Sequence, residues 1–326
     1  LEAGIEKRGR PVMEDKKKTI EEVLERLKAG TEAVFESENY KELLKVTAKL
    51  YHYSLNNCIL IAMQCPGATY VAGYQMWQRK FKRNVKKGEK GIRIIAPCSF
   101  KKWKEEDLSD PKSGKPVTGP DGKAMKKKEE VEILSYKVAY VYDVSQTAGE
   151  PLPELVHDLN GDVERYVMYK SVLEKIAPCP VHYAEIKGTA HGYYDLANKE
   201  IVVQEGMSQE QTLKTLVHEI THAQLHDKDT GSDNQVGRRA AEVEAESVAF
   251  AVCEYLGIDS SDYSFGYVAS WSQGKELEEL KACLSTIHGT SVEMIKNIEK
   301  NLILMDETAA CMQPELDMKK KTIMKL

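Results

Sequence analysis

The spacing of apolar residues predicts three helices in the first fifth of the chain. Apolar side chains recur every three or four positions over residues 14–35, 40–53 and 54–64, so each segment presents one apolar face when it is helical. Ser54 stands where an amino-terminal cap is expected, and Pro66 ends the third helix. This part of the chain is therefore expected to be helical.

The pattern then changes to one typical of strands. Gly88 and Gly91 precede three isoleucines within residues 92–95, which indicates a turn leading into a strand. Residues 131–142 alternate well enough to form the returning strand. Residues 105–129, rich in Asp, Lys, Gly and Pro, are expected to form an exposed loop within this hairpin.

After a proline-containing linker at 149–153, helical spacing returns around one predicted hairpin at 191–203. Ser208 and Gln211, three apart, resemble a capping box ahead of a helix. Further helices are expected at 162–176, 215–226, 241–253, 266–287 and 291–305. Strands and helices in this mixture favour an α+β fold in two domains.

Candidate chemistry is concentrated in the helix expected at 215–226. His218 and His222 are four residues apart, and Glu219 directly follows the first histidine. On a helix both imidazoles then share one face, where they can bind the same metal ion, and Glu219 lies beside its open position as a general base. This is the HExxH signature of zinc hydrolases. The alternative is an amphipathic helix in which two histidines share a face by chance.

A third metal ligand is expected from the helix at 241–253. Glu242 and Glu246 are four apart and share a face among small apolar residues, whereas Glu244 is expected to point elsewhere. A carboxylate on a buried face is costly unless it is paired or metal-bound. Glu242 is therefore expected to be the ligand and Glu246 the acceptor that orients a ligating histidine, although the reverse assignment stays open. His226 is a weaker candidate for the third ligand.

Charge divides the chain into two regions. The formal net charge is −5 at pH 7, but residues 79–104 contain 11 Lys and Arg against one acidic residue. Residues 151–260 contain 9 Lys and Arg against 19 Asp and Glu. A basic segment beside an acidic, hydrolase-like half suggests two separate activities.

Aromatic residues are interleaved with the cations of the basic segment. Cations contact a phosphate backbone, and aromatic rings stack on unpaired bases. Packing of the aromatic rings in the core is the competing explanation. The side chains expected to contact DNA are Trp77, Arg79, Lys80, Lys82, Arg83, Lys86, Lys87 and Lys90.

Bulk properties predict a cytoplasmic protein without a membrane partner. The longest apolar run, residues 58–63, is too short to cross a bilayer, and no secretory signal opens the sequence. Seven cysteines, an odd number without a CxxC pair, fit free thiols in a reducing compartment. Residues 1–13 and 308–326 are expected to be disordered.

Two of these motifs together resemble known peptidase families. HEITH at 218–222, followed by E-x-x-A-E at 242–246, resembles the gluzincin class of metallopeptidases. The longer run HEITHAQLH, residues 218–226, resembles the ImmA/IrrE-type peptidases and the zincin-like domain of ArdC-type antirestriction proteins. Gluzincins usually carry Asp or Asn at the last position of the second motif, where this chain has Glu246.

The amino-terminal half resembles the amino-terminal domain of ArdC-type proteins. The matching motifs lie at residues 53–57, 68–77, 85–91 and 142–147. The resemblance implies a mixed helix and strand domain over 14–147 that binds single-stranded DNA. It also implies a zincin-like, gluzincin metallopeptidase domain over 148–307.

The implied function is that of an antirestriction protein of a mobile genetic element with a zinc cofactor. Single-stranded DNA and a protein substrate would be its partners. A zincin also needs an oxyanion donor, for which His191, Tyr193 and Tyr194 are available. Two alternatives stay open: an ImmA/IrrE-like regulatory zinc protease that cleaves a repressor, and a DNA-binding protein whose zincin domain is catalytically idle.

Overall fold

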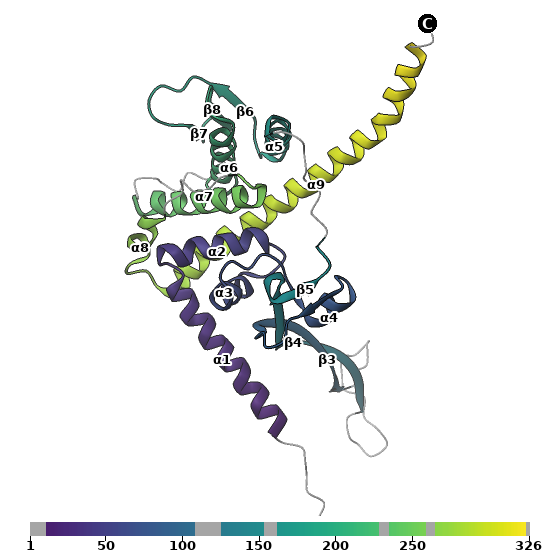
Figure 1. The fold of residues 1–326 in the computed structure, drawn as a ribbon. Helices are drawn as coiled ribbons and strands as arrows, with labels where there is room; N and C mark the ends of the chain where they lie inside the picture. The colour runs from purple at the N-terminus through teal and green to yellow at the C-terminus, as the bar shows by residue number, and fades with distance from the viewer. Residues whose placement is uncertain (1–10, 108–124, 153–161, 228–234, 259–264, 324–326) are drawn as a thin grey trace, which may run out of the picture. The chain divides into compact units, whose positions relative to one another are not determined.

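The computed structural model describes residues 11–107, 125–152, 162–227, 235–258 and 265–323 (Figure 1). The chain divides into two compact units. Unit 1 comprises Leu1–Glu25 with Arg93–Tyr140, and unit 2 comprises Arg26–Ile92 with Val141–Leu326. The expected mixture of helices and strands is confirmed.

Unit 1 is built around the expected hairpin. Its strands are β3 (Ile92–Asp107) and β4 (Lys126–Asp143), and it includes the first part of α1 (Pro11–Ala33). Both strands extend into the expected loop at 105–129, of which residues 108–124 lie outside the described part of the chain. Opposite charges pair across the two strands, because Lys101 lies 3.1 Å from Glu130 and Lys128 lies 3.1 Å from Glu105.

The first part of unit 2 contains the second and third expected helices, α2 (Ser37–Lys49) and α3 (Leu55–Gln64). Ser54 occupies the cap position of α3, as expected, but its side chain makes no cap hydrogen bond. The short elements between α3 and β3 were not expected from the sequence: β1 (Val71–Gly73), α4 (Tyr74–Arg79) and β2 (Arg83–Val85). β1 pairs with the last three residues of β4, and β2 pairs with β5 (Thr147–Gly149).

The second part of unit 2 has the element order expected around the HEITH helix. After α5 (Asp162–Ile176), three strands form a sheet in the order β6-β8-β7. β6 (Val181–Ala184) runs parallel to β8 (Glu200–Gln204), and β7 (Gly192–Asp195) runs antiparallel to it. α6 (Gln209–Leu225) and α7 (Gln235–Leu256) follow.

The last expected helices differ from those observed. A short α8 (Gly266–Ser272) precedes one continuous helix, α9 (Leu277–Ile323), where the sequence predicted a break before residue 291. The buried positions Leu284, Ile287 and Met294 keep helical spacing across that point, so one apolar stripe supports one helix. The tails expected to be disordered are helical over 11–13 and 308–323, and residues 1–10 and 324–326 lie outside the described part.

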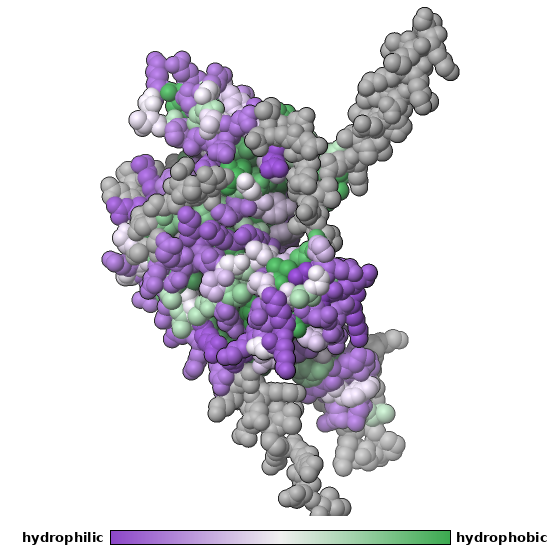
Figure 2. Space-filling model, in the orientation of Figure 1, coloured by the Kyte–Doolittle hydropathy of each residue, from purple (hydrophilic) through white to green (hydrophobic). Residues whose placement is uncertain are grey.

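α7 lies at the centre of the core of unit 2. It packs against α6, α9 and α2, and fully buried alanines at 245, 249 and 251 allow these helices to approach closely. Tyr40 of α2 hydrogen-bonds Ser247 of α7 with 2.7 Å between the hydroxyl oxygens. The visible face in Figure 2 is mostly hydrophilic, with apolar residues in smaller patches. None of the described helices is both long enough and apolar enough to cross a bilayer.

Candidate metal centre

The helix α6 is fixed so that its polar face meets α7. Ser208 caps it by accepting a hydrogen bond from the Gln211 backbone N–H at 3.2 Å. The reciprocal half of the expected capping box is replaced, because the Gln211 side chain donates to Thr215 Oγ1 instead. Buried Leu216, Val217 and Ile220 hold the opposite face in the core.

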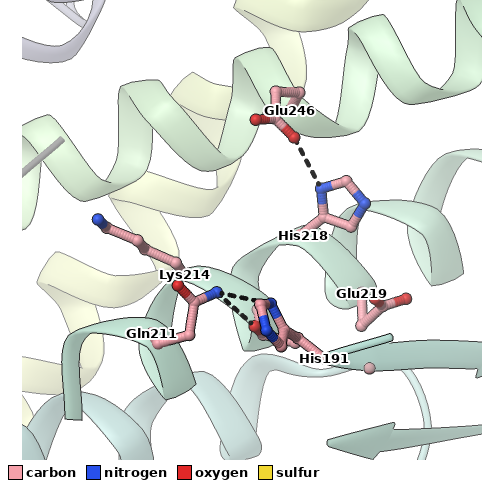
Figure 3. Close-up of a pocket in the computed structure, with 8 residues that line it drawn as sticks. His191, Gln211, Lys214, His218, Glu219 and Glu246 are labelled. Carbon is pink, nitrogen blue, oxygen red and sulfur yellow. Dashed lines mark hydrogen bonds and ion pairs between the residues drawn. The ribbon is translucent and has the colours of Figure 1, made fainter. Parts of the chain in front are cut away.

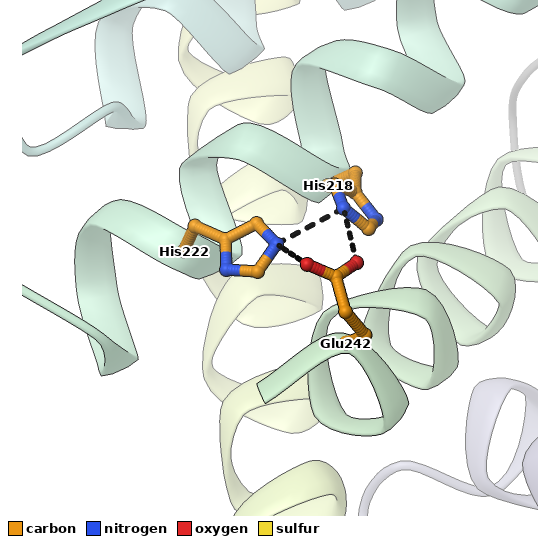
Figure 4. Close-up of side chains that lie close together, drawn as sticks. All are labelled: His218, His222 and Glu242. Carbon is orange, nitrogen blue, oxygen red and sulfur yellow. Dashed lines mark hydrogen bonds and ion pairs between the residues drawn. The ribbon is translucent and has the colours of Figure 1, made fainter. Parts of the chain in front are cut away.

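Three side chains from α6 and α7 converge on one point (Figure 4). His218 Nε2 and His222 Nε2 lie 3.0 Å apart, and each lies 3.6 Å from a carboxylate oxygen of Glu242. A tetrahedral ion with bonds of about 2.0–2.1 Å places its ligand atoms about 3.3 Å apart. Two imidazoles and one carboxylate at these separations therefore fit a divalent metal ion.

The protonation states of two of these groups, His222 and Glu242, suit metal binding. Burial lowers the pKa of His218, but the neighbouring carboxylates outweigh burial and raise it, so a metal ion would have to displace a proton there. Burial lowers the pKa of His222, and the neighbouring His218 lowers it further, which favours the neutral imidazole that a metal requires. The hydrogen bond with His218 holds the pKa of Glu242 below its ordinary value, which favours the ionised carboxylate. Both residues are thus in the form in which they could bind a cation.

Glu246 lies on the other side of His218. Its carboxylate is 3.7 Å from His218 Nδ1, the ring nitrogen that faces away from the convergence point (Figure 3). Burial raises the pKa of Glu246, with Glu242 adding to the shift and His218 opposing it. The geometry supports Glu242 as the ligand and Glu246 as the group that orients His218.

Glu219 is one of the few buried carboxylates among the described residues, at 6% exposure. Burial raises the pKa of Glu219 to about 7; the charge of His218 opposes the shift and that of Glu242 adds to it. Gly192 lies against it, because a Cβ at that position would come within 3.1 Å of Glu219 Cγ. The close approach of β7 to α6 thus fixes the surroundings of this carboxylate.

A pocket of about 400 Å³ opens beside Glu219 (Figure 3). Its lining residues come from β7 and the residue before it, from α6 and from α7: His191, Gly192, Gln211, Lys214, Thr215, His218, Glu219 and Glu246. Among the oxyanion candidates, His191 lines the pocket, while the Tyr194 hydroxyl donates to Asp227 and Tyr193 is 44% exposed. His191 is therefore the candidate that shares a pocket with His218 and Glu219.

His226 stands at the end of α6, the position favoured for this weaker ligand candidate, whereas Glu244 differs from expectation. His226 lies outside the convergence point, because its Nδ1 is 2.9 Å from His222 Nδ1 and its Nε2 is 3.0 Å from Glu244. Glu244 was expected to point away from the site, yet it contacts the end of α6. His226 lies just beyond the last turn of α6, where Glu244 comes within 3.0 Å of its Nε2.

The residues expected to bind DNA fall into two groups. Trp77 is fully buried, and its indole N–H donates to the Tyr142 carbonyl at 2.9 Å, so its ring cannot stack on a base. Arg83 donates to Thr147 Oγ1 and to the Glu150 carbonyl, which makes it part of the β2–β5 connection. The side chains that remain exposed are Arg79, Lys80, Lys82, Lys86, Lys87 and Lys90.

Comparison with known families finds one match in each half of the chain. Residues 14–142 match the family model of the N-terminal domain of the anti-restriction factor ArdC, and residues 178–255 match that of the IrrE N-terminal-like domain of the M78 peptidases. The chain pairs an ArdC domain with an IrrE-like domain. The resemblance expected from the motifs is confirmed, and the metallopeptidase-like nature of the IrrE-like domain implies a divalent metal ion.

Individual relatives of this ArdC and IrrE-like pair are distant. An uncharacterized Bacillus anthracis protein is 27% identical over 315 residues, which cover 88% of this chain and 52% of that protein. The chain thus spans about half the length of this curated relative. The metal-free structure of antirestriction protein ArdC from plasmid R388 is 21% identical with a TM-score of 0.42, and covers 76% of this chain and 83% of that one. Its Mn(II)-bound structure is 18% identical with a TM-score of 0.43, and covers 76% and 84%.

Proposed function

We propose that this chain is an antirestriction protein of a mobile genetic element, whose IrrE-like domain is a zinc-dependent metallopeptidase and whose ArdC domain binds single-stranded DNA. The observation that carries the enzymatic part is the convergence of His218, His222 and Glu242 beside the buried Glu219. Two histidines and a glutamate form one of the ligand sets of catalytic zinc, which keeps a further position open.

Each residue of the site has a definite task in peptide hydrolysis. A zinc ion held by His218, His222 and Glu242 would supply Lewis-acid polarisation and lower the pKa of bound water to about 7. Glu219 takes a proton from the attacking water on a carboxylate oxygen and delivers it to the leaving amine. The pocket beside it is the space into which a peptide side chain would enter.

His191 is the proposed oxyanion donor. It lines the same pocket as Glu219 and His218, and Gln211 Nε2 lies 3.4 Å from its Nδ1. That contact leaves Nε2 available to donate towards a carbonyl oxygen of the substrate. Replacing His191 with Ala should lower hydrolysis about 10²–10³-fold, as expected for one oxyanion donor, while zinc content is unchanged.

The decisive test separates metal binding from hydrolysis. Glu219→Gln should keep one zinc per chain but lose hydrolysis of an unfolded protein such as casein by at least about 10²-fold. His218→Ala should lose the zinc itself. Of the two carboxylates on α7, Glu242→Ala should lose most zinc affinity and Glu246→Ala about 10–100-fold.

Each alternative predicts a different result in that test. Zinc bound without hydrolysis of any peptide substrate would favour an idle, structural metal. Hydrolysis confined to a repressor, with no binding to DNA, would favour the regulatory protease. Full activity of Glu219→Gln would contradict the mechanism.

The DNA part of the proposal rests on the exposed cations of the ArdC domain. Lys86, Lys87 and Lys90 lie on the turn between β2 and β3. All three are exposed, and Lys86 Nζ also donates to the Ser145 carbonyl at 2.8 Å. Lysines contact the phosphates of any strand. The logarithm of the binding constant falls linearly with the logarithm of the salt concentration, and each lysine removed from the binding surface should reduce the magnitude of that slope by about 0.7 for single strands. Replacing all three with Ala in the full chain should therefore reduce the magnitude of this slope by about 2.

Fluorescence anisotropy with a single-stranded oligonucleotide and its duplex measures this effect. Replacing Lys187, Lys296 and Lys300, which are exposed outside the ArdC domain, removes the same charge and should leave binding unchanged. Preference for the duplex, or equal effects of the two triple variants, would contradict the assignment of this surface.

A further inference from the structure

One ring nitrogen of His222 is engaged outside the metal centre. Its Nε2 faces the point shared with His218 and Glu242, while its Nδ1 lies 2.9 Å from Nδ1 of His226. His226 is the residue at which α6 ends, and its backbone N–H donates to the His222 carbonyl at 2.8 Å. The two rings are therefore linked through both side chain and main chain.

Glu244 of α7 continues the contact. Its carboxylate lies 3.0 Å from His226 Nε2, and both side chains are mostly buried, at 23% exposure for His226 and 18% for Glu244. The Cys283 thiol of α9 also hydrogen-bonds Glu244. Burial raises the pKa of Cys283 to about 12, so the thiol remains the donor in that bond. Glu244 is thus held between α6 and α9.

With neutral rings and an ionised carboxylate, a single arrangement of protons satisfies these contacts. A histidine that binds a metal through Nε2 carries its hydrogen on Nδ1. His222 Nδ1–H must then donate to His226 Nδ1, which leaves the His226 hydrogen on Nε2. That hydrogen is donated to Glu244. Each hydrogen bond thus runs from His222 through His226 to Glu244. This direction is the one required if His222 Nε2 is to bind a metal ion.

We propose that His226 and Glu244 are positioning residues that hold the ring and the tautomer of His222 for metal binding. The inference rests on the proposed metal centre and extends it, because Glu246 contacts only His218 in the corresponding way. The chain would then carry two separate supports, one for each ligating histidine. This arrangement also explains why a histidine follows the HEITH motif at the end of α6 without facing the convergence point.

Zinc affinity tests the proposal. A chromophoric chelator competes for zinc with the full chain and its variants. His226→Ala should bind zinc about 10–100-fold more weakly, as is typical when such a support is removed. His226→Asn places an amide oxygen near the former position of Nδ1, where it can accept from His222, and should recover most of the affinity. A role in folding alone would not predict recovery by this variant.

Two further variants complete the test. Glu244→Ala, which leaves both rings in place, should weaken zinc binding about tenfold. His182→Ala removes a histidine whose Nε2 lies 3.4 Å from Glu200 on the sheet, and should leave zinc affinity unchanged. Cobalt(II) in place of zinc gives a second readout, because a reoriented His222 should alter the visible absorption spectrum in His226→Ala and restore it in His226→Asn.

The outcomes separate this inference from the proposed function. Wild-type affinity and an unchanged cobalt spectrum in both His226→Ala and Glu244→Ala would overturn the positioning role while leaving the metal centre intact. Absence of bound zinc or cobalt in the wild-type chain would overturn the metal centre, and the positioning role with it. Weaker binding by His182→Ala, equal to that of His226→Ala, would show a general loss of stability and overturn the inference.

Discussion

At the scale of single residues, the site depends on groups that take no part in chemistry. Gly192 is the clearest case, because a Cβ there would lie 2.6 Å from Thr215 Cγ2 and 3.1 Å from the Val202 carbonyl oxygen. Atoms at that distance overlap, so β7 or α6 would have to shift. The absence of a side chain at this residue lets the strand lie against the helix that carries Glu219.

Gly192→Ala should therefore impair the site without touching a ligand. We expect a loss of about 1–3 kcal/mol in the free energy of unfolding from overpacking, and at least a tenfold loss of peptide hydrolysis through displacement of Glu219. Denaturant unfolding and an activity assay measure the two effects. Gly289→Ala is the control, because nothing lies within 4 Å of a Cβ there. Unchanged activity of Gly192→Ala would show that the contact is unimportant.

Asp143 is a second residue whose effect can be predicted. Its carboxylate accepts hydrogen bonds from the backbone N–H groups of Thr69, Tyr70 and Ser145 at 2.8, 3.1 and 2.9 Å. Burial alone would raise the pKa of Asp143, but these hydrogen bonds outweigh burial and hold it below the ordinary value of 3.8. The ionised carboxylate therefore stabilises the connection around β1.

Because the pKa is lower in the folded chain, this stabilisation is present above the unfolded value and is lost as the pH falls through the folded value. Asp143→Asn should cost about 2 kcal/mol of unfolding free energy at pH 7, the loss typical of hydrogen bonds to a charged group. The difference from wild type should shrink below pH 3.8. Urea unfolding at several pH values measures it, with the exposed Glu293→Gln as the charge-removal control. A difference independent of pH would contradict the assignment.

At the scale of elements, periodic patterns were predictable and tertiary contacts were not. Helical spacing places His218 and His222 on one face of α6, and Glu242 and Glu246 on one face of α7. The structure brings these two faces together. Trp77 was expected to contact DNA because it lies among cations, but whether an aromatic ring is buried depends on distant segments such as the end of β4. The three-residue strands were missed because they are too short to show any alternation.

One face of α7 packs against α2, where a buried hydrogen bond joins the Tyr40 and Ser247 hydroxyls. Ser247 donates to the Val243 carbonyl, so Tyr40 donates its hydroxyl hydrogen to Ser247. Tyr40→Phe removes this buried hydrogen bond and should lower the free energy of unfolding by about 1 kcal/mol. Guanidinium unfolding monitored by circular dichroism detects the change. The exposed Tyr193→Phe should have no measurable effect, and equal losses for both variants would contradict the role of the contact.

At the scale of the whole molecule, the two compact units do not meet at the domain boundary expected near residue 147. Residues 26–92 belong to the same compact unit as residues 141–326. Helix α2 packs on α7 and α9, and α3 packs on α9. Beyond Tyr40 and Ser247, the Tyr51 hydroxyl donates to Glu299 at 3.0 Å. Local sequence patterns cannot reveal such packing, because each segment shows its apolar face but not the partner that covers it.

Residues 14–147 expressed alone should therefore fold poorly. The fragment would expose the surfaces of α2 and α3 that α7 and α9 cover, and α2 carries the fully buried Leu43 and Leu44. We expect no cooperative thermal transition and association into larger species, measured by circular dichroism and size-exclusion chromatography. The full chain is the control. A monomeric fragment that melts cooperatively near the temperature of the full chain would show that the ArdC domain folds independently.

The shared surface between α2 and α7 also bears on how such chains can evolve. Exchange of the first segment for that of a distant relative would place unmatched side chains against Ser247, Phe265 and Glu299. Recombinants with an intact metal centre and an intact basic surface would then be selected against for packing alone. The two segments are expected to be inherited as a pair, with substitutions on α2 compensated by substitutions on α7, α9 and the residues between them.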